Sequence, residues 1–436
     1  MLRIFIVDNI PSLNKGEMAI LDGMLESFKI LGDVKVSMLS SHAEIDAPRY
    51  ASKVKVIGIS KSWPLNGGLD CSKICRIMVS VAIMIQHMVF ILSYKILGKW
   101  ILSLFKSDIW KEYLTADIII EGHNGAFGIN GYLGIPILYP IYLPIFAKLL
   151  GKPTVLYAGS VPKANRFRFI FDRFLKLALN NLDLITLREN ISHNNLKTIG
   201  AKENNAFVTA DLAFLLKPAQ LNKINEIIIR ESIDNRSTKL VGMTITREIA
   251  SKSQPELDPD KSYYNHICMM AKFIDSITSN YNATFIFVPH CIGFEKNLDD
   301  RIPAKDIFEI CNNKARVKLI TNEYDAKELK GLIGEFDLFI GERIHSVIGA
   351  MSMNVPSICI SFSNDKRLDI LKMIGQENAI CYVEDLDANK LILKFENIWS
   401  NTEKIKENLK VNIETIQNIS MRNGELLKDM YEARLK

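Results

Sequence analysis

Arg343 and His345 are residue types that could bind an anion and move a proton, and they stand two positions apart. The apolar run before them, Leu338–Ile340, predicts a buried strand ending at Gly341, and the small residues after them predict a helix. Both would then lie at a helix N-terminus, where backbone N–H groups and the helix dipole favour anions. Arginine offers a planar fork to carboxylate or phosphate, and histidine titrates near neutral pH. The alternative is a capping ion pair and a hydrogen-bonded interior histidine.

His290 and Lys366 follow two other strand-like runs of the second half, Thr284–Val288 and Ser357–Ile360. Ligands of open α/β sheets bind beyond the carboxyl ends of the strands. We therefore expect His290 and Lys366 on the same rim as Arg343, with Lys366 as a further cation. The alternative for His290 is a simple loop histidine.

Arg188 and Asp211 each follow a strand-like run of the first half. Arg188 could face the same small anion as Arg343, or it could form a surface ion pair with Glu189 or Asp183. Asp211 could cap the turn that follows it or orient a catalytic group. Both alternatives stay open for each residue.

Two turns supply further candidates for substrate contact. Asn14 and Glu17 open the first predicted helix, where an ordinary cap by Asn14 is the alternative. The glycine turn at 121–125 contains His123 and Asn124, and glycine lets the backbone approach a ligand closely.

Several function classes find no support in the sequence. There is no P-loop, His-Glu-x-x-His or Gly-x-Ser-x-Gly motif and no carboxylate cluster that assigns a metal, so we expect no metal site. A net charge of +5 is a small excess for 436 residues and predicts no nucleic-acid binding. Seven scattered cysteines favour a reducing compartment, and the N-terminus lacks the features of a secretory signal.

Short apolar runs alternate with helical patterns along the chain, which predicts an α/β fold of parallel strands with helices on both faces. The length favours two domains. We expect an N-terminal Rossmann-like domain over 1–217, a linker from Lys217 to about Ile224, a second Rossmann-like domain over 225–386 and a C-terminal helical segment over 387–436. A cleft between the domains would hold the site.

One helical stretch, about 77–106, carries much of the slightly positive mean hydropathy of +0.08. Ile77–Tyr94 has no formal charge, and Lys95, Lys99 and Lys106 fall on one helical face. Three structures stay open: a helix lying on an anionic membrane surface, a helix packed on the protein or a second subunit, and a membrane span. Gln86 and His87 count against a span, and a span would separate strands that we expect to share a sheet.

At these residues the chain resembles the polysaccharide pyruvyl transferase family. The resemblance runs up to about Gly375 and is most specific at Gly341-x-Arg343-x-His345-Ser346. Its other parts are Asn14-x-Gly16-Glu17, Leu187-Arg188-Glu189-Asn190-Ile191-Ser192, Ala210-Asp211-Leu212-Ala213-Phe214, Pro356 and Lys366. One departure is Gly-His-Asn-Gly at 122–125, where the family usually has consecutive glycines.

The resemblance implies a GT-B-like pair of Rossmann domains that transfers pyruvate from phosphoenolpyruvate to two hydroxyls of a sugar, forming a cyclic ketal and releasing phosphate. Arg343, with Arg188 and Lys366, would clamp the donor, and His345 would be the acid. His290, Asp211 and Glu17 stay open as the base. The expected partners are phosphoenolpyruvate and a sugar precursor of an exopolysaccharide or capsule, either free or lipid-linked. No cofactor is expected, and a metal requirement and a homo-oligomer stay open.

Two rival functions stay open besides this one. A GT-B glycosyltransferase would use a nucleotide sugar, although the Glu-x7-Glu pair of some retaining members has no match here. A non-catalytic, membrane-associated scaffold would leave Arg343 and His345 without a role. For the transferase we expect a cytoplasmic protein, with peripheral attachment to the inner face of the cell membrane left open.

Overall fold

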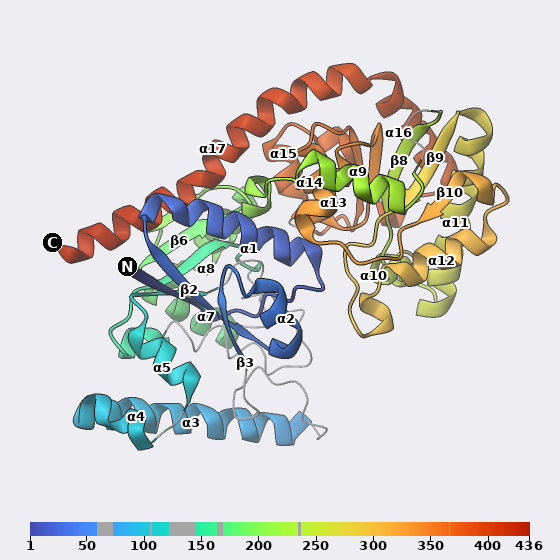
Figure 1. Ribbon diagram of the computed structural model, residues 1–436. Coiled ribbons are helices and arrows are strands. Elements are labelled where there is room, and N and C mark those ends of the chain that lie inside the picture. The colour runs from blue at the N-terminus through green and yellow to red at the C-terminus, as the bar shows by residue number, and fades with distance from the viewer. Residues whose placement is uncertain (59–72, 105–106, 122–144, 164–168, 234–236, 366) are drawn as a thin grey trace. The chain divides into compact units, whose positions relative to one another are not determined.

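The chain divides into two compact units, each built around its own parallel sheet. One unit contains Met1–Ser12, Leu25–Asp211 and Met421–Lys436, and the other contains Leu13–Met24 and Leu212–Ser420. The computed structural model describes residues 1–58, 73–104, 107–121, 145–163, 169–233, 237–365 and 367–436 (Figure 1).

In the described residues the first unit has a seven-stranded sheet in the order β3-β2-β1-β4-β5-β6-β7, with every pairing parallel. The strands are β1 (Leu2–Ile6), β2 (Val34–Ser40), β3 (Lys55–Gly58), β4 (Ile118–Glu121), β5 (Thr154–Gly159), β6 (Leu184–Leu187) and β7 (Ala206–Val208). The order reverses between β1 and β4, where doubly wound sheets bind their ligands.

The second unit repeats this topology with six described strands in the order β10-β9-β8-β11-β12-β13, again all parallel. They are β8 (Lys239–Thr244), β9 (Ala283–Phe287), β10 (Val317–Leu319), β11 (Leu338–Gly341), β12 (Ser357–Ser361) and β13 (Ile380–Tyr382). The order reverses between β8 and β11. The two sheets confirm the predicted GT-B-like α/β fold.

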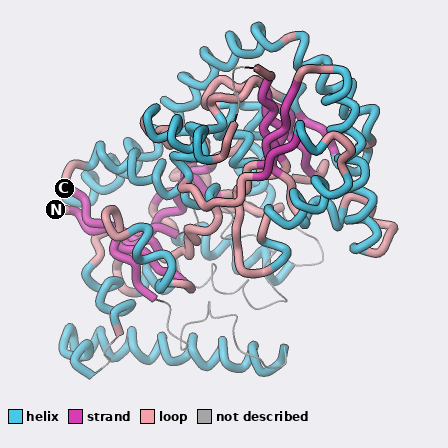
Figure 2. Tube along the Cα trace, turned by 45° about the vertical axis from the view of Figure 1, so that its right-hand side comes forward, coloured by secondary structure: helices cyan, strands magenta, loops and turns pink. Residues whose placement is uncertain are grey.

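Helices cover both faces of each sheet (Figure 2). Those within the first unit are α2 (Ala43–Tyr50), α3 (Lys73–Leu97), α4 (Ile101–Leu104), α5 (Asp108–Thr115), α7 (Phe169–Asn181) and α8 (Asn190–Ile199). Those within the second are α9 (Leu221–Arg230), α10 (Arg247–Lys252), α11 (Pro259–Asn280), α12 (Arg301–Ile310), α13 (Ala326–Ile333), α14 (Ile344–Met351), α15 (Leu368–Met373) and α16 (Ala388–Ser400). Residues of α1 (Lys15–Ser27) and α17 (Thr402–Leu435) belong to both units.

The central strands of both sheets are apolar runs with buried side chains, whereas the edge strands β3, β7 and β10 are only partly buried. All four residues of β4, β6 and β11 and all six of β5 are buried. Parallel sheets covered by helices on both faces require such continuous apolar runs. This explains why the sequence pattern located the strands closely.

The linker expected from Lys217 to Ile224 is too long, because α9 begins at Leu221. Ile224, Ile227 and Ile228 are buried on one side of this helix. Spacings of three and four residues place these isoleucines on one helical face. The linker therefore stops before Leu221.

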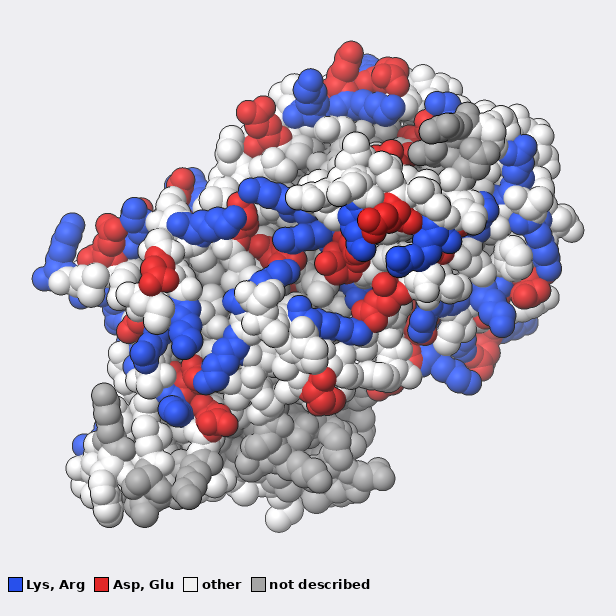
Figure 3. Space-filling model, viewed as in Figure 1, with Lys and Arg blue, Asp and Glu red and all other residues white. Residues whose placement is uncertain are grey.

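α3 follows β3 and precedes β4 along the chain. β1 and β4 are parallel neighbours, with Ile4 opposite Ile118, so the strands before and after the helix share a sheet as the sequence argument required. Among the described residues, no helix combines the length and apolarity that crossing a membrane demands. Figure 3 shows basic and acidic side chains mixed over much of the surface in view.

Candidate functional site

Arg343 lies directly before α14, beyond the carboxyl end of β11, as predicted. Its guanidinium forms a fork with the Asp300 carboxylate: Nη2 lies 2.7 Å and Nε 3.2 Å from Oδ1. Burial alone would lower the pKa of Arg343, but the Asp300 carboxylate raises it above its usual range. Nη1 has no hydrogen-bond partner among the described residues, and the side chain is 21% exposed. Arg343 is therefore a fixed cation with donors left for a ligand.

Asp300 is itself held by the loop after β9. Its Oδ2 accepts hydrogen bonds from the backbone N–H groups of His290 (3.0 Å) and Cys291 (2.8 Å). The carboxylate is 2% exposed. Asp300 thus connects His290 to Arg343, because it binds the backbone of one residue and the side chain of the other.

The turn between β11 and α14 is anchored by Glu342, whose carboxylate bonds to His266 and the Thr246 backbone. Glu342 Oε1 lies 2.6 Å from Nε2 of His266 on α11, and Oε2 accepts a hydrogen bond from the Thr246 backbone at 2.7 Å. Ser346, in the first turn of α14, lies 2.8 Å from the Thr244 hydroxyl at the end of β8. These buried contacts fix the backbone that carries Arg343 and His345 at the point where the strand order reverses.

His345 packs against the start of α1. A Cβ atom on Gly16 would lie 2.7 Å from His345 Nδ1 and 2.8 Å from its Cβ, closer than real contacts allow. The motif Asn14-x-Gly16 therefore needs glycine so that the imidazole can approach the backbone. The Asn14 side chain accepts a hydrogen bond from the Gly16 N–H at 3.1 Å, which is the capping role considered for it.

His290 is buried among positive groups. Its pKa is lowered to about 3, first by burial and then by His345, Arg343 and Lys15. Lys15 is 2% exposed, its ammonium lies 2.7 Å from Glu323, and its backbone N–H donates to the His290 carbonyl at 2.8 Å. His290 Nδ1 is buried without a hydrogen-bond partner in the described residues. At neutral pH this histidine is uncharged, within a positive field that suits an anion.

A pocket opens beside these residues at the carboxyl ends of β8, β9 and β10. Asp300 contributes to its wall, and the rest of the lining is mostly apolar with two cations. The lining residues are Met243, Ile245, Phe287, Val288, Pro289, Asp300, Arg301, Ala304, Lys305, Leu319, Ile320 and Thr321. One wall of the pocket is therefore shared with the carboxylate that fixes Arg343. Among the described residues, no three His, Cys, Asp or Glu side chains are grouped to hold a metal ion.

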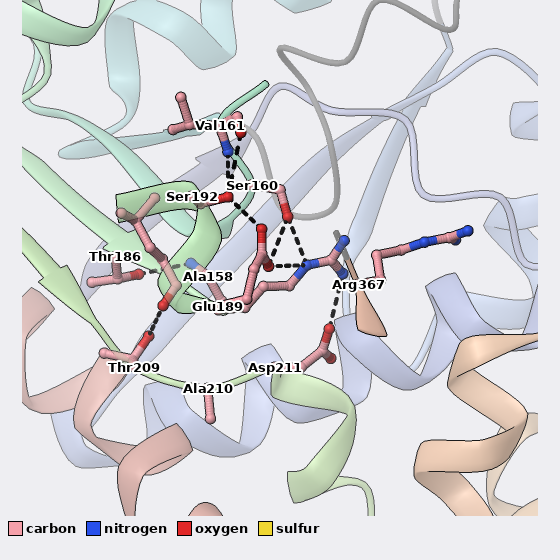
Figure 4. A network of polar contacts seen from close by, with 12 residues as sticks. Ala158, Ser160, Val161, Thr186, Glu189, Ser192, Thr209, Ala210, Asp211 and Arg367 are labelled. Carbon is pink, nitrogen blue, oxygen red and sulfur yellow. Dashed lines mark hydrogen bonds and ion pairs between the residues drawn. The ribbon is translucent and has the colours of Figure 1, made fainter. Parts of the chain in front are cut away.

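Arg188, in the first unit, has a different environment. Its side chain is 1% exposed; Nη1 lies 2.8 Å from Asp211 Oδ2, and Nε lies 2.9 Å from the Ser160 hydroxyl and 3.2 Å from Glu189 (Figure 4). The sequence left Glu189 and Asp183 open as partners of a surface ion pair with Arg188. Arg188 pairs with Glu189, whereas Asp183 pairs with Lys148. The Arg188–Glu189 pair is buried and does not lie on the surface. Arg188 is held between two carboxylates.

Asp211 forms a buried ion pair with the Arg188 guanidinium. The segment before it is fixed by Asn423 of α17, which accepts a hydrogen bond from the Thr209 hydroxyl at 2.8 Å and donates to the Ala210 carbonyl at 3.3 Å. Glu189 also accepts hydrogen bonds from the Ser160 and Ser192 hydroxyls. Arg188 is therefore one member of a continuous buried network.

The structure brings four predicted residues into the second unit's cluster: Asn14, His290, Arg343 and His345. Glu17 lies half-buried in the first turn of α1. His123, Asn124 and Lys366 lie outside the described residues. The cluster is thus assembled from three chain segments that are distant in sequence.

Sequence reasoning missed Asp300, Lys15 and the Glu342–His266 pair, because their significance depends on partners distant in the chain. It also passed over Glu121, which closes β4 beside the strand-order reversal. This carboxyl is 1% exposed, burial and the nearby Asp8 raise its pKa well above the usual range, and neither oxygen has a hydrogen-bond partner in the described residues. The signal available in the sequence was a glutamate that directly ends an apolar run, Ile118–Glu121.

Comparison with known proteins supports the fold and gives the family. The chain resembles solved structures of a glycosyltransferase from Rickettsia africae (12% identity, TM-score 0.60, 100% of this chain and 99% of that one) and a UDP-GlcNAc 2-epimerase from Neisseria meningitidis (12%, 0.59, 98% and 99%). These likenesses show the fold. The amylovoran biosynthesis protein AmsJ of Erwinia amylovora is 21% identical over 412 residues, covering 93% of this chain and 94% of that protein. A family model, polysaccharide pyruvyl transferase, matches residues 14–364, and the chain belongs to that family.

Proposed function

We propose that this transferase moves pyruvate from phosphoenolpyruvate onto two hydroxyls of a sugar in a surface-polysaccharide precursor, forming a cyclic ketal. The observation that carries the proposal is the pairing of a fixed cation, Arg343, with an imidazole, His345, at the N-terminus of α14. Phosphoenolpyruvate is a small, highly charged anion whose methylene carbon must accept a proton. Arg343 and His345 offer these two functions.

In the proposed reaction Arg343 binds the donor through its Nη1 donors while Asp300 holds the rest of the guanidinium. His345 donates a proton to the methylene carbon of phosphoenolpyruvate, which leaves an oxocarbenium-like carbon. One sugar hydroxyl attacks this carbon and loses its proton to a base. The C–O bond to phosphate then breaks, phosphate departs, and the second hydroxyl attacks with loss of its proton to close the ketal.

His290 is a poor candidate for the base. A histidine with a pKa near 3 binds a proton weakly at neutral pH, so it would accept one from a hydroxyl less readily than an ordinary imidazole. We assign it to hydrogen bonding in its uncharged form. Asp211 already pairs with Arg188, which leaves Glu17 as the candidate to test first.

The acceptor class rests on family membership and on the relative named for amylovoran biosynthesis. Both indicate polysaccharide assembly. A carbohydrate acceptor with two neighbouring hydroxyls is the class that ketal formation requires.

The test is incubation of the full chain with phosphoenolpyruvate and a panel of free and lipid-linked oligosaccharides. We expect phosphate release and an acceptor mass gain equal to one pyruvic acid less one water. His345→Ala should lower the rate about 100- to 10,000-fold while the far-UV circular dichroism spectrum stays that of the unmodified protein. Normal turnover by this variant would remove His345 from the mechanism.

Nucleotide sugars form the comparison arm of the same panel. Transfer of a sugar from a UDP- or GDP-sugar, together with no pyruvyl transfer from phosphoenolpyruvate to any acceptor, would contradict the proposal and show a glycosyltransferase instead.

A further inference from the structure

The outward side of α3 in the first unit is unusually apolar. Among the described side chains of α3 and the turn after it, nine large hydrophobic ones are exposed: Met78, Val81, Ile85, Met88, Val89, Leu92, Ile96, Leu97 and Trp100. Ile96 is 82% exposed and Met78 66%. Isolated exposed hydrophobic residues are common, but a contiguous patch marks an interaction surface.

The exposed and buried residues of α3 occupy opposite sides of one helix. His87, Phe90 and Ile91 are buried, and Phe90 stacks on Trp110 of α5 at 3.9 Å between ring centroids. At 100° per residue, most of the exposed side chains from Met78 to Ile96 fall within an arc of about 100° that is centred roughly opposite the buried residues. The packed side attaches α3 to its unit. It gives no reason for the apolar residues on the outward side.

The charge of this stretch has one sign. From Cys71 to Ser107 the sequence contains Lys73, Arg76, Lys95, Lys99 and Lys106 and no Asp or Glu. Lys95 is exposed, and its position on the helix borders the apolar arc. Apolar side chains flanked by basic ones, with an exposed Trp100 at the end, are typical of helices that lie in a membrane interface.

We propose that the outward face of α3, defined by Val81, Ile85, Met88, Val89, Leu92 and Ile96, binds an anionic lipid surface. Its apolar side chains would enter the boundary between headgroups and acyl chains, and Lys95 at its border would meet the lipid phosphates. A second copy of the chain fits less well, because a two-fold contact would bring two basic segments together without an acidic partner. The inference is independent of pyruvyl transfer, since lipid binding is measured without either substrate.

The experiment is co-sedimentation of the full chain with vesicles of phosphatidylcholine containing about 30% phosphatidylglycerol, and with pure phosphatidylcholine. We expect binding to the anionic vesicles, at least about 10-fold weaker binding to the neutral ones, and partial release in about 0.5 M NaCl. The double variant Ile85→Asp/Leu92→Asp should reduce binding at least about 10-fold, and Lys95→Glu should reduce it less.

The matched control is Leu393→Asp, which places a charge at a 66%-exposed leucine on α16 in the other unit. It should bind vesicles as the unmodified chain does. Absence of binding to anionic vesicles, or undiminished binding by the double variant, would overturn the proposal. So would a concentration-dependent dimer, seen by light scattering, that the double variant abolishes, because the face would then belong to a second copy.

Discussion

Arg188 and Arg343 arise from the same local pattern, an arginine just after a buried parallel strand with a glutamate beside it, yet their environments differ. Glu189 turns toward Arg188, which also reaches Asp211 and is 1% exposed. Glu342 pairs with His266 instead, so among the described residues Arg343 has one carboxylate partner, Asp300, and it is 21% exposed. The difference teaches that the direction taken by the neighbouring carboxylate decides whether such an arginine is enclosed in the fold or keeps donors for a ligand.

The strongest test of this comparison removes the enclosed cation. Arg188→Met should lower the free energy of unfolding by about 3–5 kcal/mol, because Glu189 and Asp211 would stay buried without their shared partner. Urea denaturation followed by circular dichroism measures the change. A loss below about 1 kcal/mol would show that the network does not depend on Arg188.

Arg343→Met should cost less stability than Arg188→Met but much more activity. The unfolding free energy should fall by about 1–3 kcal/mol, because Asp300 keeps its two backbone hydrogen bonds. Phosphate release from phosphoenolpyruvate should fall about 100- to 1,000-fold, because a preorganised donor to the anion is lost. Lys239→Met, which removes a more exposed cation paired with Asp337 at the amino end of β8, is the control and should retain most of the activity. Equal rates for Arg343→Met and the unmodified chain would end the assignment of Arg343 to donor binding.

Gly16→Ala tests the close approach on which the second unit's cluster depends. The added methyl group would force His345 to move, so we expect a loss of about 1–3 kcal/mol in unfolding free energy and at least a 10-fold slower phosphate release. Gly349→Ala on α14 is the matched control, because its added Cβ meets nothing within 4 Å. Alanine is a better helix former, so this variant should gain up to about 1 kcal/mol. Indistinguishable behaviour of the two variants would contradict the packing of His345 on Gly16.

The smallest expected effect is the loss of stability in acid that results from the lowered pKa of His290. His290 has a pKa near 3 in the folded chain and near 6.5 when unfolded, so below pH 6.5 the unfolded chain binds more protons and stability falls as the pH decreases. Between pH 8 and pH 5 this contributes about 2 kcal/mol of lost stability. His290→Gln should remove that part of the pH dependence in urea titrations at the two pH values.

His87 is the matched histidine in the first unit, with a pKa lowered to about 4 by burial. His87→Gln should also flatten the acid dependence of stability but leave the KM for phosphoenolpyruvate unchanged, whereas His290→Gln should raise that KM. An equal KM for phosphoenolpyruvate in both variants would show that His290 does not contribute to donor binding.

Much of the fold followed from local sequence pattern. The bounds of β9, β11 and β12 agree to within one residue with the expected runs Thr284–Val288, Leu338–Ile340 and Ser357–Ile360, because a strand buried on both faces is a continuous apolar run. The apolar pattern does not predict β13 (Ile380–Tyr382), an edge strand with only two buried residues. The expected linker from Lys217 to Ile224 includes the first residues of α9, which begins at Leu221. Lys217-Pro218 is a clear boundary signal, whereas the start of this helix has none.

The sequence by itself determined that Arg343 and His345 lie together beyond a strand, because strand, turn and helix onset are consecutive in the chain. Only the tertiary structure decided what surrounds them. Asp300 reaches Arg343 across 43 residues of sequence, and Gly16 meets His345 from the opposite end of the chain. Such partners depend on how strands and loops are brought together in space, which no local periodicity encodes. For the same reason, sequence spacing could place a charged side chain at a strand end but could not tell the enclosed Arg188 from the more open Arg343.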